Sequence, residues 1–164
     1  MKRLNPTLLV AALCLMLFGA AGSVRASQES SNVLPDEVLA ALRNPDKVTL
    51  YSIEMAPGTG KNSLYGFRIL GHVELNAARS SVAIQAFESA VANWNGVMAE
   101  CFNARHAMRV EANHHTYDLL LCYECHQLEA YRDGRMVCEI GATGSPKVLN
   151  GLLTSAGIPL AKPE

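Results

Sequence analysis

Residues 105–123, RHAMRVEANHHTYDLLLCY, decide the fold. Residues 105–111 and 116–123 are rich in β-forming side chains, and they flank the polar loop 112–115. A hairpin with this four-residue loop sets Arg109 opposite Asp118, which is a favourable cross-strand charge pair. The leucine run at 119–121 predicts a central strand that is buried on both faces.

More strands are predicted on both sides of this hairpin. Residues 47–55 and 67–75 alternate apolar and polar side chains and predict two strands, separated by a glycine-containing loop at 56–63. Downstream, residues 128–132 and 135–140 flank Asp133-Gly134, a strong hairpin signal. In that hairpin Cys138 lies opposite Glu129, and Cys138 shares a core face with Met136 and Ile140.

Three helices complete the predicted fold. One opens at Pro35 and runs to Arg43, with acidic residues in its first turn, and a last one starts at Ser145-Pro146. Between them, residues 80–95 carry an apolar stripe typical of an amphipathic helix. The order of elements predicts a single α+β domain over residues 35–164, in which about three helices pack on a largely antiparallel sheet.

The N-terminal residues predict export. A basic start at Lys2 and Arg3 precedes an apolar run at 8–18, and small residues lead to Val24-Arg25-Ala26. This pattern is typical of a signal peptide over residues 1–26, and the run is too short for a transmembrane anchor. We therefore expect a periplasmic or secreted protein that is not an integral membrane protein after cleavage, with a flexible tether at residues 27–34.

Removal of the signal peptide changes the charge and the cysteine count. The full chain of 164 residues has 14 basic and 15 acidic side chains. Loss of Lys2, Arg3 and Arg25 leaves 11 basic residues against the same 15 acidic ones, a net charge of −4 that gives no reason to expect nucleic acid as a partner. Cys14 is lost as well, so four cysteines reach an oxidising compartment: Cys101, Cys122, Cys125 and Cys138.

Two redox interpretations apply to the sequence Cys122-Tyr-Glu-Cys125-His126. It matches the C-x-x-C-H pattern that attaches c-type haem, although it follows a predicted strand and precedes a hairpin. Alternatively, Cys122 and Cys125 form the active pair of a thiol–disulfide oxidoreductase. A helix that would stabilise the first thiolate is not predicted after Cys125.

A zinc site is a further hypothesis. Cys122 and Cys125 have the spacing of half a tetrahedral site, and Cys101 and His106 could supply the other two ligands. In the predicted register His106 lies opposite Leu121, on the other face from Cys122. The four ligands therefore converge only if the chain turns or bulges at residues 123–124.

The simplest interpretation of the cysteines needs no cofactor. In an exported protein the four cysteines are expected to form one structural disulfide with the remaining thiols buried, and the pairing is left open by spacing alone. A Cys125–Cys138 bridge would contradict the second hairpin, because the two residues lie about 13 Å apart along it at ~3.3 Å per residue. Cys138 is therefore expected to be a small buried apolar residue.

The residues C-F-N-A-R-H-A at 101–107, followed by D-L-L-L-C-Y-E-C at 118–125, resemble a paired motif of uncharacterised exported bacterial proteins. That motif reads C-F-x-P-R-H-G and then D-[LF]-[VL]-I-C-[FY]-x-C. The resemblance covers most of residues 64–160 and implies a shared fold and a shared Cys/His site. This chain departs from the motif at Ala104 and Ala107, and His126 lies outside it.

Other catalytic patterns are missing from the sequence, which has no G-x-S-x-G and no H-E-x-x-H. His114 and His115 are expected to be solvated loop residues. We therefore expect a non-enzymatic exported protein with a structural or metal-binding cluster of Arg105, His106 and three cysteines. A haem carrier and a thiol–disulfide enzyme are the alternatives.

Overall fold

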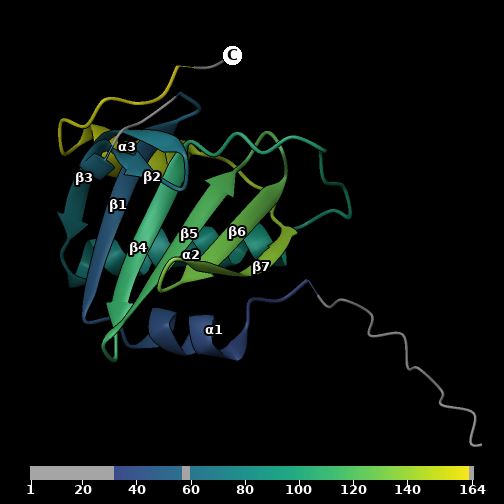
Figure 1. Ribbon diagram of the computed structural model, residues 1–164, viewed down its shortest axis with the longest axis horizontal. Helices are drawn as coiled ribbons and strands as arrows, with labels where there is room; N and C mark the ends of the chain where they lie inside the picture. The colour runs from purple at the N-terminus through teal and green to yellow at the C-terminus, as the bar shows by residue number, and fades with distance from the viewer. Residues whose placement is uncertain (1–31, 57–59, 163–164) are drawn as a thin grey trace, which may run out of the picture. The chain divides into compact units, whose positions relative to one another are not determined.

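An antiparallel sheet of seven strands organises the part of the chain that the computed structural model describes, residues 32–56 and 60–162 (Figure 1). The strand order across the sheet is β2-β3-β1-β4-β5-β6-β7. The strands are β1 Lys47–Glu54, β2 Ser63–Leu64, β3 Phe67–Leu75, β4 His106–Ala112, β5 His115–Cys122, β6 Gln127–Arg132 and β7 Arg135–Gly141. A short 3-10 turn, Gly60–Asn62, precedes β2.

The central hairpin β4–β5 has the predicted register. Arg109 pairs with Asp118 across the two strands. The Arg109 Nε and Nη2 atoms donate to the two carboxylate oxygens of Asp118, at 2.6 and 2.8 Å. The predicted four-residue loop is instead a two-residue turn at Asn113 and His114, both with positive φ, and the strands extend through residues 112 and 115. Because the loop shrinks by one residue on each side, the register is unchanged.

The helices are α1 Asp36–Arg43, α2 Ala77–Ala92 and α3 Lys147–Thr154. The helix expected at 80–95 begins three residues earlier, because the Asn76 side chain caps it by accepting a hydrogen bond from the Arg79 backbone N–H at 3.0 Å. It also ends earlier, with Asn93 as its C-cap, so that Trp94 lies outside the helix. The prediction of an α+β domain with three helices on an antiparallel sheet is confirmed.

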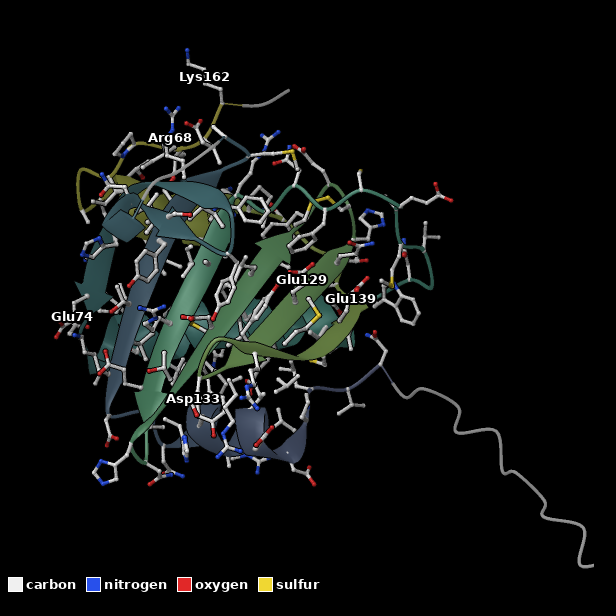
Figure 2. The ribbon with its side chains drawn as sticks, in the orientation of Figure 1. Arg68, Glu74, Glu129, Asp133, Glu139 and Lys162 are labelled. Atoms are coloured by element: carbon white, nitrogen blue, oxygen red, sulfur yellow. A yellow bond between two sulfur atoms is a disulfide. The ribbon has the colours of Figure 1, made fainter. Side chains whose placement is uncertain are left out.

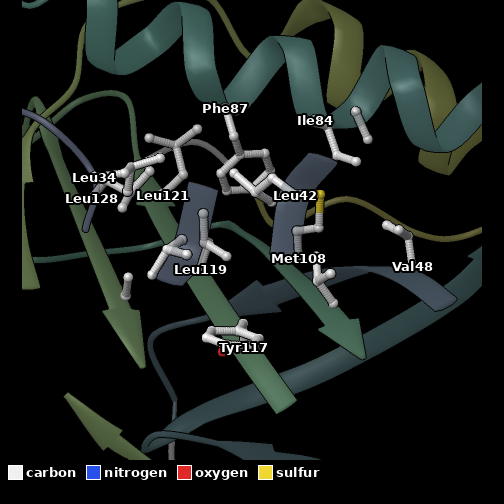
Figure 3. Close-up of a cluster of buried hydrophobic side chains, with 14 of the residues drawn as sticks. Leu34, Leu42, Val48, Ile84, Phe87, Met108, Tyr117, Leu119, Leu121 and Leu128 are labelled. Carbon is white, nitrogen blue, oxygen red and sulfur yellow. The ribbon is translucent and has the colours of Figure 1, made fainter. Parts of the chain in front are cut away.

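The main core lies between these helices and one face of the sheet. Phe87 projects from α2 toward Met108 of β4 and Leu119 of β5 (Figure 3), and all three are fully buried. Burial of side chains of this size contributes ~1.5–3 kcal/mol each. A smaller apolar cluster on the opposite face gathers around Ile53 and Leu120. The central strands are thus buried on both faces, as the leucine run predicts.

The second hairpin differs from its predicted register. The β6–β7 turn is at Asp133-Gly134 as expected, but a bulge between Ala130 and Tyr131 shifts the pairing, so that Cys138 lies opposite Ala130. The prediction that Cys138 faces Glu129 is therefore wrong. Because the bulge interrupts the alternation of faces, Met136 is 49% exposed, and Cys138 is only partly buried.

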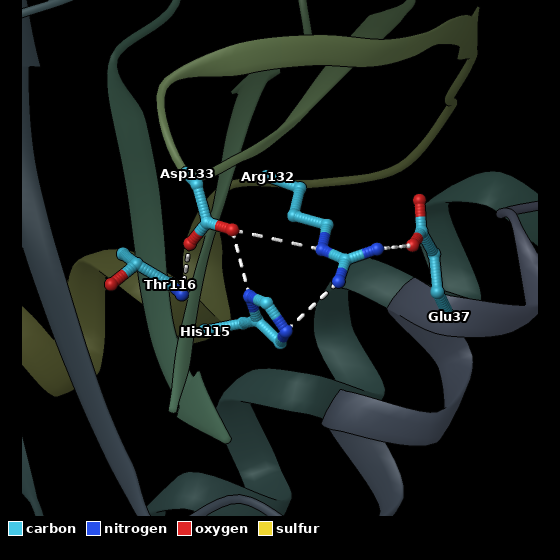
Figure 4. A network of polar contacts seen from close by, with 5 residues as sticks. All are labelled: Glu37, His115, Thr116, Arg132 and Asp133. Carbon is cyan, nitrogen blue, oxygen red and sulfur yellow. Dashed lines mark hydrogen bonds and ion pairs between the residues drawn. The ribbon is translucent and has the colours of Figure 1, made fainter. Parts of the chain in front are cut away.

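A polar network joins this turn to the first helix (Figure 4). The His115 Nδ1–H donates to the Asp133 carboxylate at 2.7 Å, and His115 Nε2 accepts from Arg132 at 2.9 Å. Arg132 also contacts Glu37 of α1, and Asp133 accepts from the Thr116 backbone N–H at 3.0 Å. The expectation of a solvated loop histidine is thus wrong for His115, whose ring connects two strands.

The predicted signal peptide, residues 1–26, and most of the predicted tether lie outside the described residues. In the described part of the chain, the helices are too short and not apolar enough to cross a membrane.

Candidate functional site

A cavity of about 680 Å³ opens between one end of the sheet, α3 and the C-terminal segment. Its floor comes from the end of β1 and the start of β4, and one wall comes from the end of β5. The C-terminal segment covers the cavity with Leu160 and Ala161. Lys162 lies at the same end of the sheet as the end of β5, on the outside of this segment (Figure 2).

The floor holds two buried polar side chains that are cross-strand neighbours, Ser52 of β1 and His106 of β4. Ser52 is 1% exposed and His106 is 4% exposed. The His106 Nε2–H donates to Asn150 Oδ1 of α3 at 2.7 Å. Among the described residues, none forms a hydrogen bond with His106 Nδ1 or with Ser52 Oγ. These two atoms are called the floor pair below.

His106 is neutral at physiological pH. Its pKa is lowered to about 4, mainly by burial and to a smaller extent by the nearby charge of Arg105, whereas the hydrogen bond to Asn150 acts in the opposite direction. Because Nε2 carries the proton that Asn150 accepts, Nδ1 presents a lone pair. The floor of the cavity therefore contains one acceptor at His106 and a hydroxyl at Ser52 that can donate or accept, and both atoms are withdrawn from the cavity surface in this conformation.

The lining is mainly apolar and includes three charged side chains, Arg105, Glu124 and Lys162. Leu121 and Leu160 line the walls, with Tyr123, whose ring meets the His106 ring edge to face at 6.0 Å between centroids. Burial raises the pKa of Tyr123 to about 12, so its hydroxyl stays protonated. Arg105 pairs with the exposed Glu124 at 3.0 Å.

The turn after β5 is closed by a disulfide between Cys122 and Cys125, whose Cα atoms lie 5.2 Å apart. Both residues are 2% exposed. The Cys125 backbone N–H donates to Cys122 Sγ at 3.0 Å, and the Asn103 backbone N–H donates to Cys125 Sγ at 3.1 Å. The expectation of one disulfide is borne out, and the pairing that the sequence left open is Cys122 with Cys125. The expectation that the remaining thiols are buried is wrong for Cys101, which is exposed, and Cys138 is only partly buried.

The other two described cysteines are thiols in different environments. Cys101 is exposed, in the irregular segment between α2 and β4. Cys138 is partly buried on β7, and burial raises the pKa of its thiol. The two thiols therefore differ in accessibility, and the segment that carries Cys101 contacts the disulfide through the Asn103 backbone N–H.

The structure brings part of the predicted cluster together. Arg105, His106 and Cys122 line one cavity, and Cys125 is bonded to Cys122. Within residues 32–56 and 60–162, no three side chains of His, Cys, Asp or Glu are arranged to hold a metal ion. In the disulfide state the two sulfurs are bonded to each other, so the zinc and haem hypotheses apply to the reduced chain and stay predictions. His126 adopts a positive φ in the turn, and its carbonyl accepts from the Ala142 backbone N–H.

Sequence reasoning missed Ser52 and Asn150. Ser52 carries a usable signal, because it follows Val48 and Leu50 at alternate positions and so occupies a core position of β1 with a polar side chain. Asn150 lies in an apolar helix beside Leu149, but its partner is 44 residues away, and no local pattern indicates that contact.

Comparison of the chain with protein-family models, with curated proteins and with solved structures finds no match.

Proposed function

We propose that this is an exported, non-catalytic binding protein that holds a small organic molecule in the cavity above Ser52 and His106. The floor pair is the observation that carries the proposal. Leaving a buried polar group without a hydrogen bond costs ~1–3 kcal/mol, and the two atoms of the floor pair are neighbours at the bottom of one cavity. Because both atoms are withdrawn from the cavity surface, a ligand reaches them only after the side chains that cover them move, and the hydrogen bonds that it then forms would remove both costs.

The chemistry of the cavity narrows the class of ligand. Its volume of about 680 Å³ lies within the ~300–1,000 Å³ typical of small-molecule sites. Because His106 Nδ1 is an acceptor, the buried end of the ligand must supply an N–H or O–H donor. The apolar walls favour an apolar body. Two lining cations, Arg105 and Lys162, face one lining carboxylate, Glu124, and this excess of positive charge favours a polar or anionic group on the ligand.

The disulfide has a structural role in this proposal. It closes the turn that carries Tyr123 and Glu124, which line the cavity. A covalent link restricts the conformations of a short turn in the unfolded chain and holds the wall in the folded protein. The Cys/His cluster then shapes a binding site and needs no resident cofactor. Export follows from the predicted signal peptide.

Replacement of Ser52 by Ala tests the proposal. The variant loses an unsatisfied buried hydroxyl, so the free energy of unfolding of the ligand-free protein should stay the same or rise by up to about 1 kcal/mol. Binding should weaken instead. The probe is anilinonaphthalene sulfonate, which combines an apolar body, an N–H donor and an anionic group, and we expect its Kd to rise about tenfold, from the loss of one ~1.4 kcal/mol hydrogen bond.

Thr143→Val is the matched control, because the Thr143 hydroxyl is also buried and, in the described part of the protein, has no partner. Thr143 does not line this cavity, so its replacement should leave the probe's Kd unchanged. Ala161→Trp should fill the cavity and abolish binding, whereas Ala78→Trp, on an exposed turn of α2, should not. Equal probe affinity in the wild type, Ser52→Ala and Ala161→Trp would refute the proposal.

A further inference from the structure

The segment that carries Cys101 is fastened to Cys125 on both sides of Cys101. On one side, the Ala99 backbone N–H donates to the Cys125 carbonyl at 2.9 Å, and the Gln127 side chain donates to the Ala99 carbonyl. On the other side, the Asn103 backbone N–H donates to Cys125 Sγ itself at 3.1 Å. Cys101 therefore lies between two anchors that both end at the same cysteine.

Backbone dimensions limit how far Cys101 can be from this sulfur. The Cα atom of Cys101 lies no more than ~6 Å from the backbone nitrogen of Asn103, since the two are separated by one full residue. With the 3.1 Å contact, the Cα atom of Cys101 is within ~9 Å of Cys125 Sγ. A short movement of this exposed, irregular segment would bring the Cys101 thiol into contact with Cys125 Sγ.

The environment makes Cys101 the thiol with access to the disulfide. Both disulfide cysteines are 2% exposed, so the protein shields their sulfurs from thiols in solution. Cys101 is an exposed thiol, and its neighbour in the chain by two residues already touches Cys125 Sγ. Cys138, in contrast, is held on β7 opposite Ala130, in the middle of β6 and five residues beyond Cys125 in the chain.

We propose that Cys101 exchanges with the Cys122–Cys125 disulfide. The Cys101 thiolate attacks Cys125 Sγ, a Cys101–Cys125 bond forms, and the Cys122–Cys125 bond breaks with Cys122 leaving as a thiolate. The proton that Cys101 releases to water is matched by the one that Cys122 takes up. The step is an isomerisation, so the number of disulfides stays the same and no external oxidant or reductant is consumed.

The exchange gives the protein an activity that is separate from ligand binding. Cys122 is a buried residue among those that line the cavity, so the product isomer has its free thiol inside the protein, beside the cavity. The original isomer has its thiol on the surface at Cys101. The position of the reactive thiol thus moves between the surface and the cavity, whether or not the cavity binds a ligand.

Trapping of thiols in the wild-type protein tests the exchange. The protein, without reductant, is transferred to denaturant with excess N-ethylmaleimide, digested with pepsin, and the labelled cysteines are identified by mass spectrometry. We expect label on Cys101 in some molecules and on Cys122 in others, with Cys138 labelled throughout as the internal control. Cys101→Ser should lose all label on Cys122. Label on Cys101 and Cys138 alone in the wild type would overturn the proposal.

A second variant tests the geometry directly. In Cys122→Ser the sulfur of Cys125 has lost its partner, and oxidised glutathione should drive formation of a Cys101–Cys125 disulfide, two mass units lighter than the fully reduced variant. Cys138 should remain a thiol in the same sample. A variant that is folded by circular dichroism but pairs Cys125 equally with Cys101 and Cys138, or with glutathione only, contradicts the proposal. If this variant does not fold, the wild-type trapping decides. Neither readout depends on binding of the fluorescent probe.

Discussion

At the scale of single residues, two polar side chains in apolar positions distinguish the cavity from the core. Ser52 continues the buried face of β1 after Val48 and Leu50, and His106 continues the buried face of β4 before Met108. An apolar residue at position 52 would remove the cost of an unsatisfied polar group, whereas one at position 106 would also break the hydrogen bond to Asn150. The cavity therefore holds groups that lower stability unless a ligand satisfies them.

The pKa of His106 makes stability depend on pH. The ring binds a proton near pH 6.5 in the unfolded chain, but only near pH 4 in the folded protein, because burial disfavours its charged form. The stability is therefore full above pH 6.5 and is lost as the pH falls from 6.5 toward 4, by about 3 kcal/mol in total. Urea unfolding between pH 7 and pH 4 measures this loss.

His106→Gln should remove this part of the pH dependence, because the amide does not titrate. His114→Asn is the control, since His114 is exposed in the β4–β5 turn and asparagine tolerates its positive φ. It should keep the wild-type profile. A loss of stability toward pH 4 that is the same in His106→Gln and the wild type would show that the ring does not cause it.

At the scale of elements, the turn sequence predicts the strand register poorly in both hairpins. Asp133-Gly134 is a strong turn signal, and the turn forms there, but the bulge near Tyr131 changes the strand register that a regular hairpin would have. Asn113-His114 is a weaker turn signal, yet the β4–β5 hairpin has the register that the Arg109–Asp118 pair predicts. The charge pair, which is almost fully withdrawn from solvent at Asp118, specifies the register more strongly than the turn residues.

One substitution in the β4–β5 turn should raise the stability of the protein. His114 has φ near 64°, in the left-handed region that costs a non-glycine residue ~1–2 kcal/mol, and glycine is the preferred residue at the second position of this turn. His114→Gly should raise the free energy of unfolding by about 0.5–1 kcal/mol, after the greater flexibility of glycine in the unfolded chain is subtracted. Thermal unfolding by circular dichroism measures the change.

Ser81→Gly provides the comparison for the turn, because Ser81 is exposed in the interior of α2. At this helical position the residue has no positive φ that glycine would relieve, so only the greater flexibility of glycine in the unfolded chain remains. Stability should therefore fall by about 0.5–1 kcal/mol. A destabilising effect at both positions would mean that the positive φ of His114 carries no cost.

At the scale of the whole molecule, close contacts between distant segments build the site. The ring of Trp94, which follows α2, packs directly on Gly141 at the end of β7. Ile158 of the C-terminal segment packs on Gly71 of β3, where an added Cβ would lie 2.9 Å from its side chain. The Ile158 contact holds the C-terminal segment against the sheet, and that segment lines the cavity.

Replacement of Gly141 by Ala should disrupt one of these contacts. The new Cβ would lie 2.2 Å from the Trp94 ring, so the indole must move, at a cost of about 1–3 kcal/mol for overpacking. We expect lower stability together with a red shift of tryptophan emission, since Trp94 is the only tryptophan of the chain. Gly151→Ala, in α3 with open space at its Cβ, should instead stabilise by about 0.5–1 kcal/mol. Unchanged emission and stability in Gly141→Ala would contradict the packing described.

The sequence by itself determined the elements and the centre of the sheet. Strand alternation, the charge pair of Arg109 with Asp118 and the helical apolar stripes are patterns between residues that are close in the chain, so they could be interpreted without the fold. His106, Arg105 and Cys122 were also predicted as site residues, from their chemistry and spacing. The predicted boundaries of α2 were less accurate, because the Asn76 cap, and not the apolar stripe, sets where the helix begins.

Only the tertiary structure decided the bulge in β6–β7, the Cys122–Cys125 pairing and the cavity. Ser52, His106 and Asn150 come from three elements spread over about a hundred residues, and the balance of packing and hydrogen bonds that brings them together has no local signature. The pairing of the cysteines depends on how the chain turns after β5. Local chemistry therefore predicted the secondary structure, whereas the long-range contacts determined which polar groups beside the cavity are buried without a hydrogen bond.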